Sequence, residues 1–509
     1  MRNFKNKLKL VLCIAASLIL AASFFASKIF NPGKRPAGTG YNVILLIIDD
    51  LRPDHLGCYG YRRNTSPHID KLAGESCIFK NSFSDAAYTL PSTISILTSV
   101  YPDSHGVFHV YKDKLSPRIY TLPEIFGIYG YKTAWFSVLK EPHLDIKAGF
   151  GRGFQKAGNL GASLDETADI LSWLEKNRGK KFFLAVDARS VHDYYDFFIK
   201  AETGKNFSLI SDIRKVNEQY YLKLVEAARL GRPPFRSPEL LQGNEELFDG
   251  NYREGKEKMI LGLLDAAGRA EAAVIAEPLY RDFVKRVGPD HPNLLVESYD
   301  MAVRYTDEKL INPVLRKVKE LKLYGKTIII ITADHGELLG EHGFYGHNHL
   351  LVDESLRVPL IIRFPCLRNP RSIKALAQGV DIMPTVLELT GLIVPSQVQG
   401  KSLVGLMCKT GSGNAREYVI SEGESGKTIR SADWRLLFDY SGNCLLYNVV
   451  SDPGGYDNKC FKEEQVACRL KSALKAWEES LPSYRDQEYF FDPGVDKVAQ
   501  ERIRKTGYW

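Results

Sequence analysis

The 509-residue sequence predicts an open α/β sheet with helices on both faces. Continuous apolar runs rich in β-branched residues recur along the chain, helical patterns lie between them, and acidic residues follow directly after two of the runs. An apolar run without alternating polar residues is typical of a strand buried on both faces. Helices between such strands are the crossover connections that parallel pairing requires.

The core strands are expected where these apolar runs occur. They are NVILLII at 42–48, TAWFSV at 133–138, KFFLAV at 181–186, KTIIIIT at 326–332 and VPLIIRF at 358–364. Helical periodicity is expected over 163–177 and over 299–321. Pro313 lacks the N–H that a helix interior needs, and we therefore expect it to kink or interrupt the second helix.

The first 40 residues predict a short cytoplasmic stub, a membrane anchor and a linker. The uncharged run over 10–27 is about long enough to cross a bilayer as a helix. Basic residues precede it, which predicts that the amino terminus stays in the cytoplasm and that the rest is exported to the periplasm or the cell exterior. A cleaved signal peptide is the alternative, because Ala21-Ala22-Ser23 is a possible cleavage site, and the protein would then be secreted.

The rest of the chain is expected to form two units. Residues 41–395 contain the apolar runs and form the large domain, in which 197–296 is a charged, helical insertion without a strong core strand. Residues 396–509 contain shorter β-rich runs and are expected to form a small C-terminal subdomain with antiparallel strands, followed by a tail.

Charge and cysteine content restrict the class of protein. The net charge of +7 is modest, and no basic stripe with interleaved aromatic residues indicates a nucleic-acid partner. Cys444, Cys460 and Cys468 lie close together in the sequence and can supply one disulfide in an exported protein. Buried free thiols are the alternative.

Acidic residues and a histidine stand at the ends of two of the predicted strands. Asp49 and Asp50 follow NVILLII, and Asp334 and His335 follow KTIIIIT after one alanine. Adjacent buried carboxylates are costly unless a positive charge lies between them. Hard oxygen ligands with one imidazole suit Ca²⁺, Mg²⁺ or Mn²⁺, and Zn²⁺ is possible. We therefore expect a metal site, although an aspartate at a strand end can also be a turn former.

The stretch DAAYTLPSTISILTS predicts a helix whose N-terminus faces the same edge of the sheet. Pro91 suits the first turn of this helix, which puts Thr89 at the start, where backbone N–H groups and the helix dipole favour an anion. A hydroxyl held there beside a metal ion can attack phosphorus or sulfur. A simple N-cap role for Thr89 is the alternative.

A series of motifs in a fixed order then relates the chain to a known family. They are NVILLIIDDLRPDHLGCYGY, TSPHIDKLA, PSTISILTSVYPDSHGV, GFGRGF, YDMAVRYTDEKL, TIIIITADHGELLGEHGFYGHNHLLVDESLRVPLIIRFP, VDIMPTVLELTGL and LYNVVSDP. Over about residues 41 to 455 the sequence resembles the sulfatase family of the alkaline phosphatase superfamily.

This resemblance implies a sulfatase-like mixed sheet sandwiched by helices and one divalent metal ion, usually calcium. The implied nucleophile is Thr89, at the position where sulfatases oxidise a cysteine or serine to formylglycine. Threonine cannot form that aldehyde, and Thr93 stands where the family motif has an arginine. The implied metal ligands are Asp49, Asp50, Asp334 and His335.

The resemblance also implies roles for histidines. His192 matches an active-site histidine that follows the third strand, and it would bind a substrate oxygen or protonate the leaving group. His349 stands where many sulfatases have a lysine that contacts the transferred group, and either His349 or His347 can protonate the leaving group. The alternative for His347 is that it only caps a turn in its glycine-rich loop.

The predicted function is metal-dependent hydrolysis of a sulfate or phosphate ester of a small molecule, glycan or lipid. Family likeness favours sulfate, whereas the threonine nucleophile favours phosphate or phosphonate esters. Two alternatives stay open. One is a membrane-anchored phosphotransferase for phosphoethanolamine or glycerol phosphate, and the other is a catalytically silent binding protein.

Overall fold

The fold is described from a computed structural model. It covers residues 40–109, 113–137, 148–159, 167–192, 194, 293–339, 341–343, 345–347, 351–367, 370–408, 415–423, 426–439 and 444–484. The predicted anchor at 10–27, all but the last residues of the predicted insertion at 197–296, and His349 lie outside these residues. Within the described ranges, every helix is too short or too polar to cross a membrane.

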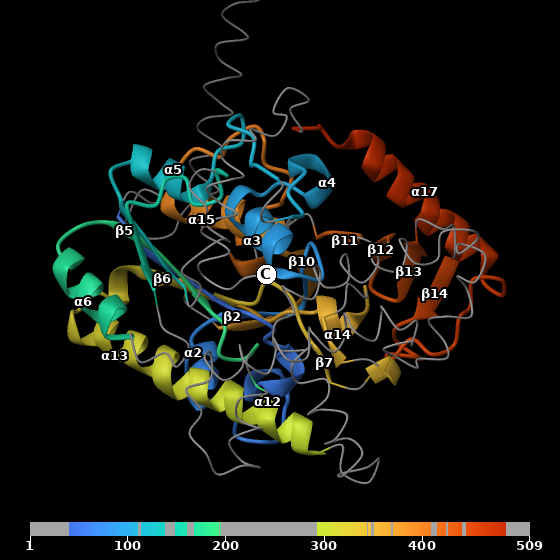
Figure 1. The fold of residues 1–509 in the computed structure, drawn as a ribbon, viewed down its shortest axis with the longest axis horizontal. Helices are drawn as coiled ribbons and strands as arrows, with labels where there is room; N and C mark the ends of the chain where they lie inside the picture. The colour runs from blue at the N-terminus through green and yellow to red at the C-terminus, as the bar shows by residue number, and fades with distance from the viewer. Residues whose placement is uncertain are drawn as a thin grey trace, which may run out of the picture.

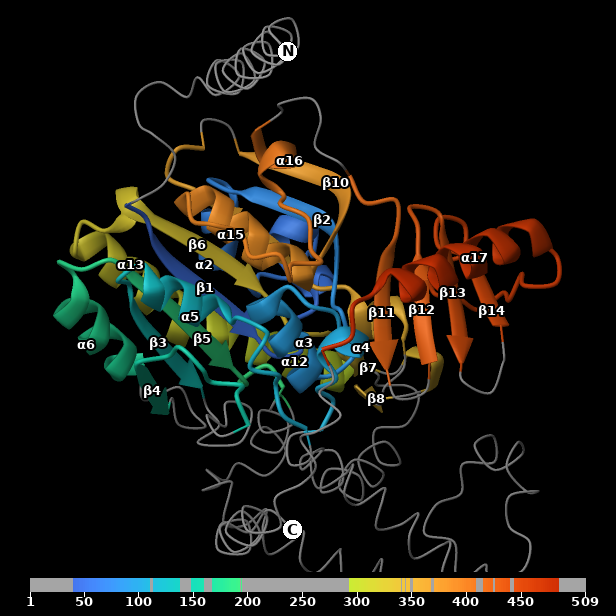
Figure 2. The same cartoon turned by 90° about the horizontal axis from the view of Figure 1, so that it is seen from above.

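An eight-stranded mixed sheet forms the centre of the molecule, with the order β10-β2-β9-β6-β1-β5-β3-β4 (Figures 1 and 2). β9 is antiparallel to both of its neighbours, and the other pairs are parallel. The strands are β1 (Asn42–Ile48), β2 (Cys77–Phe83), β3 (Lys132–Ser137), β4 (Lys156–Asn159), β5 (Phe182–Ala188), β6 (Thr327–Thr332), β9 (Leu360–Arg363) and β10 (Arg371–Gln378).

The five predicted strands are all present, and they are the contiguous centre of this sheet, β9-β6-β1-β5-β3. The strands that the patterns did not reveal, β2, β10 and β4, lie toward the two edges. β2 and β10 alternate between buried and partly exposed residues over much of their length, and a half-exposed strand does not need a continuous apolar run.

Helices cover both faces of the sheet, as the sequence predicts. In β1, Ile44, Leu46 and Ile48 pack toward one helical layer, while Val43 and Leu45 pack toward the other. The first layer contains α2 (Pro67–Ala73), α6 (Thr167–Asn177), α12 (Asn293–Thr306) and α13 (Asn312–Glu320). The second contains α3 (Thr89–Thr98), α5 (Leu122–Ile128), α15 (Ile382–Thr390) and α16 (Val404–Cys408).

The predicted interruption near Pro313 is also present. A π-helical turn, η4 (Asp307–Ile311), separates α12 from α13. Pro313 lies in the first turn of α13, where no N–H is needed. The wider π turn therefore accommodates the proline, and the chain continues as a helix into α13.

The C-terminal part forms the small antiparallel sheet that the sequence predicts, to one side of the large sheet (Figure 2). Helix α17 (Glu464–Ser480), which the sequence patterns did not reveal, packs on it through Leu470 and Leu474. A disulfide joins Cys444 to Cys460, whereas Cys468 is an exposed free thiol. The strands are β11 (Val419–Gly423), β12 (Gly426–Arg430), β13 (Trp434–Asp439) and β14 (Cys444–Asn448).

The disulfide predicts a measurable stabilisation of this subdomain. Cys444 and Cys460 are separated by 16 positions, and closing a loop of that length in the unfolded chain contributes about 2–4 kcal/mol. The paired change Cys444→Ser with Cys460→Ser should lower the free energy of unfolding in urea by that amount. Cys468→Ser is the matched control and should change it by less than about 0.5 kcal/mol. Equal effects of the two changes would contradict the assigned pairing.

Candidate active site

Three neighbouring parallel strands bring the acidic residues together. β6, β1 and β5 lie side by side in this order, with their carboxyl ends at one edge of the sheet. Asp49 and Asp50 follow β1, Asp334 and His335 follow β6 after one residue, and Asp187 lies near the end of β5. The Asp49 N–H donates to the Ala188 carbonyl at 2.9 Å, which continues the β1–β5 pairing into the site. Parallel pairing therefore gathers these side chains.

His335 lies between the predicted acidic ligands. Its Nδ1 is 2.9 Å from Asp50 Oδ1, and its Nε2 is 3.4 Å from Asp49 Oδ1 and 3.5 Å from Asp334 Oδ2. All four side chains are buried. The structure thus brings the four predicted ligands into one cluster.

The backbone at Asp50 is held in an uncommon conformation. Its φ of 64° lies in the left-handed region, which costs a residue other than glycine roughly 1–3 kcal/mol. The buried Tyr299 hydroxyl donates to the Asp50 carbonyl at 2.6 Å and accepts from the Arg52 N–H at 2.8 Å. These two hydrogen bonds hold the turn that points Asp49 and Asp50 into the same space.

The carboxylates of this cluster lack enough hydrogen-bond donors. Both carboxylate oxygens of Asp49 and of Asp50, and Oδ2 of Asp334, are buried and accept no hydrogen bond from the described residues, although His335 and Arg189 form ion pairs with this group. Burial and the nearby charges of Asp334 and Asp50 raise the pKa of Asp49 to about 8. Burial and the charge of Asp49 raise the pKa of Asp187 to about 7. Such groups fit a divalent cation, which would replace the missing donors with positive charge.

Two overlapping groups have the geometry of a metal site. Asp49, Asp334 and His335 form one, and Asp50, His335 and His347 form the other, each with its ligand atoms within 4.8 Å of one another. Burial alone would lower the pKa of His335, but the charges of Asp334 and Asp50 raise it well above its usual value. Without a metal ion, the protonated imidazole supplies positive charge to the cluster, and it would lose that proton on binding a cation.

Thr89 is placed at the start of a helix that points into the cluster. It is the first residue of α3, and Tyr88 occupies the N-cap position. The half-buried Thr89 has its Oγ1 3.2 Å from His335 Nε2, so its hydroxyl faces the acidic cluster rather than capping the helix. The positive end of the α3 dipole lies at the same place, where it favours a negative group.

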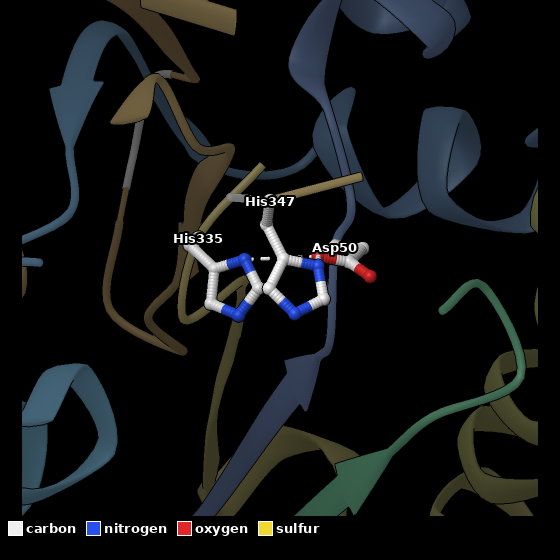
Figure 3. Close-up of side chains that lie close together, drawn as sticks. All are labelled: Asp50, His335 and His347. Atoms are coloured by element: carbon white, nitrogen blue, oxygen red, sulfur yellow. Dashed lines mark ion pairs between the residues drawn. The ribbon is translucent and has the colours of Figure 1, made fainter. Parts of the chain in front are cut away.

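His347 and His192 complete the described part of the site. The His347 ring lies 4.7 Å from the His335 ring and 5.2 Å from the His192 ring, measured between centroids. Figure 3 shows His335 and His347 beside the Asp50 carboxylate. His347 Nδ1 is 2.9 Å from Glu337 Oε2. Of the predicted catalytic residues, Thr89, His192 and His347 therefore meet here, and His349 lies outside the described residues.

Asp187, Arg189 and Glu337 were not predicted from the sequence. Arg189 Nε is 3.2 Å from Asp49 Oδ2, and the Tyr194 hydroxyl donates to Glu337 Oε1 at 3.2 Å. Asp187 and Arg189 stand at the end of a predicted buried strand, which is the same signal that indicated Asp49 and Asp334. Glu337 carried no such signal, because a charged residue in a loop is usually solvated.

Comparisons with known proteins identify the family of this chain. The family model described as Sulfatase matches residues 41–392, and a model described as N-sulphoglucosamine sulphohydrolase, C-terminal, matches residues 340–479. N-acetylglucosamine-6-O-sulfatase of Bacteroides thetaiotaomicron is 25% identical over 92% of this chain and 91% of its own length.

Solved structures share the fold. A protein in complex with its substrate D-glucosamine-2-N,6-O-disulfate has a TM-score of 0.61 at 19% identity, covering 88% of this chain and 99% of its own. Phosphonate monoester hydrolase of Agrobacterium radiobacter has a TM-score of 0.57 at 18% identity, covering 86% of this chain and 95% of its own.

Proposed function

This chain belongs to the sulfatase family of sulfuric ester hydrolases, and we propose that it hydrolyses a sulfate ester of a glycan or small molecule through Thr89. The contact of Thr89 Oγ1 with His335, inside a cluster of buried carboxylates, is the observation that carries this proposal. The name of the N-acetylglucosamine-6-O-sulfatase relative supports a sulfated sugar as the substrate class.

One divalent cation belongs to the proposed function, with Ca²⁺ preferred over Mg²⁺, Mn²⁺ or Zn²⁺. Asp49, Asp50, Asp334 and His335 would hold it, and the buried carboxylate oxygens without hydrogen-bond partners support this assignment. When bound, such a cation lowers the pKa of a hydroxyl beside it and withdraws charge from the transferred group.

The proposed reaction has two steps. Thr89 Oγ1 gives its proton to solvent water and bonds to sulfur, while the bond from sulfur to the ester oxygen breaks. His347 Nδ1 is held by Glu337, which leaves Nε2 as the atom that would give a proton to the departing oxygen. In the second step, water attacks the sulfur, which releases sulfate and restores the threonine hydroxyl. Water is required because a sulfated threonine cannot collapse to an aldehyde.

Hydrolysis of a phosphate or phosphonate ester is the second candidate. A threonine nucleophile favours it, because threonine cannot form the aldehyde through which sulfatases release sulfate, and phosphonate monoester hydrolase shares this fold. Mass analysis of the trapped protein, after incubation with an aryl sulfate or an aryl phosphate, identifies the anion on Thr89. Product analysis separates hydrolysis from transfer, because a phosphotransferase would leave a modified acceptor.

We further propose that the catalytic domain acts outside the cytoplasm, held to the membrane by the segment at 10–27. The Cys444–Cys460 disulfide supports this location, because disulfides persist mainly in oxidising compartments. A secreted form would result if that segment were cleaved.

Removal of the Thr89 hydroxyl should abolish the reaction. Thr89→Ala should lower kcat with an aryl ester by roughly 10³-fold or more, whereas Thr89→Ser should keep part of the activity, because it retains the nucleophilic oxygen. Thr98→Ala is the matched control at the other end of α3, where the hydroxyl bonds to the Ile94 carbonyl. Thr98→Ala should lower the free energy of unfolding and leave kcat near the wild-type value. Wild-type activity in Thr89→Ala would rule out the proposed nucleophile.

Cation affinity should rise with pH. The pKa of Asp49 is raised to about 8 in the cation-free protein, so below that pH a bound cation must displace its proton. Calorimetric titration of chelator-treated protein with Ca²⁺ should show affinity increasing between pH 6 and pH 8 by up to about tenfold per unit for each proton displaced from Asp49 and His335. Asp49→Asn should weaken binding and flatten this dependence, while the exposed Glu175→Gln should alter neither. A pH-independent affinity in the wild-type protein would contradict the proposed ligand role of Asp49.

The Glu337–His347 pair predicts a dependence on the leaving group. Glu337→Gln replaces the carboxyl group that pairs with His347 Nδ1 by a neutral amide, which weakens the hold on the imidazole. We therefore expect kcat to fall by about tenfold or more for alkyl esters, whose leaving oxygen needs a proton, and much less for nitrophenyl esters. Equal losses on both ester types would indicate that Glu337 only stabilises the loop.

A further inference from the structure

We infer that Arg189 contacts the anionic group of the substrate and supplies the positive charge that α3 lacks at Thr93. This inference deepens the proposed function, because it names a residue that binds the transferred sulfuryl or phosphoryl group. It rests on the position of Arg189, the charge of the site, and the residue present at position 93.

The strand order places Arg189 at the centre of the site. Arg189 directly follows β5, which pairs in parallel with β1, and Ile48 lies opposite Ala188. The Asp49 N–H bond to the Ala188 carbonyl fixes the chain beside the acidic cluster. The guanidinium Nε reaches Asp49 Oδ2 at 3.2 Å, and 16% of the Arg189 side chain is exposed. An incoming substrate therefore has a route to this side chain.

A permanent positive charge beside this acidic cluster would favour an anionic substrate. Asp49, Asp50, Asp187, Asp334 and Glu337 are buried together, and a sulfate or phosphate ester is itself negative. A guanidinium keeps its charge at every working pH, and its planar set of N–H donors matches two oxygens of a tetrahedral anion. Arg189 thus offsets the repulsion between the acidic cluster and the substrate.

His192 orients this guanidinium. Arg189 Nη2 lies 2.9 Å from His192 Nε2, and since a guanidinium only donates, the imidazole must accept with a neutral nitrogen. His192 is therefore a positioning residue for Arg189 in this arrangement, while His347 pairs with the acidic Glu337.

The residue at position 93 supplies no positive charge from α3. Thr93 lies four residues after Thr89 on α3, which puts the two on the same side of the helix. Its side chain is 2% exposed, and its hydroxyl has no hydrogen-bond partner among the described residues. A threonine there carries no charge, whereas the family motif has an arginine at this position. Arg189 reaches the same cluster from β5.

The test uses the purified full chain and two readouts, ester hydrolysis and binding of inorganic sulfate or inorganic phosphate by calorimetry. Arg189→Gln should lower kcat/KM by roughly 10- to 100-fold, the usual effect of losing a charged hydrogen bond, and should weaken binding of the preferred anion by about tenfold. Arg189→Lys should recover part of both, because it restores the charge without the planar fork. The sulfate and phosphate arms show which anion the site prefers.

Arg178→Gln is the matched control, since this exposed arginine lies just before β5 and pairs only with Glu175 among the contacts described for it. It should leave both readouts unchanged. Wild-type anion affinity in Arg189→Gln would overturn the inference. Equal losses of kcat/KM in Arg189→Gln and Arg189→Lys, with anion binding intact, would also overturn it, because Arg189 would then only hold Asp49. If Arg189→Gln does not fold, anion binding by Arg189→Lys decides the question. A fully active Thr89→Ala would instead reject the nucleophile and leave the anion-binding result standing.

Discussion

Repulsion among buried carboxylates at the end of three parallel strands is the constraint on which the rest of this site depends. β6, β1 and β5 can pair only with their carboxyl ends together, and this brings Asp49, Asp187 and Asp334 into a space with few donors. Buried like charges that lie close together are unfavourable unless positive charge balances them. A protonated His335 and the adjacent Arg189 supply such charge, and the proposed cation would supply it in place of the His335 proton.

The surrounding elements then set the direction of each group. Tyr299 reaches from α12 to hold the left-handed turn at Asp50, and Arg52 in turn donates to the Glu337 carbonyl at 2.9 Å. Glu337 is thereby placed to hold His347, while the N-terminus of α3 brings Thr89 to His335. The proposed nucleophile and the proposed acid therefore approach the cluster from separate elements, as a displacement at sulfur or phosphorus requires.

Much of this arrangement could be predicted from sequence because it depends on local patterns. An apolar run without alternation indicates a strand buried on both faces, and the five runs found in this way are the contiguous centre of the sheet. Asp49 and Asp334 were recognisable because each follows such a run. β2 and β10 were not predicted because their half-exposed faces do not need continuous apolar residues. Glu337 was not predicted because its partner, His347, lies in a different part of the loop.

The sequence by itself determined the family, the central strands, and the residue types available for chemistry, because these depend on composition and order along the chain. Only the tertiary structure decided that Thr89 faces His335, that Glu337 holds His347, and that Arg189 rather than a residue of α3 brings an arginine to Asp49. Thr89 and Arg189 reach their partners from other elements, and the parallel register of β1 with β5 places Arg189 beside Asp49. A distance between elements that are far apart in sequence is a property of packing, which no local pattern records.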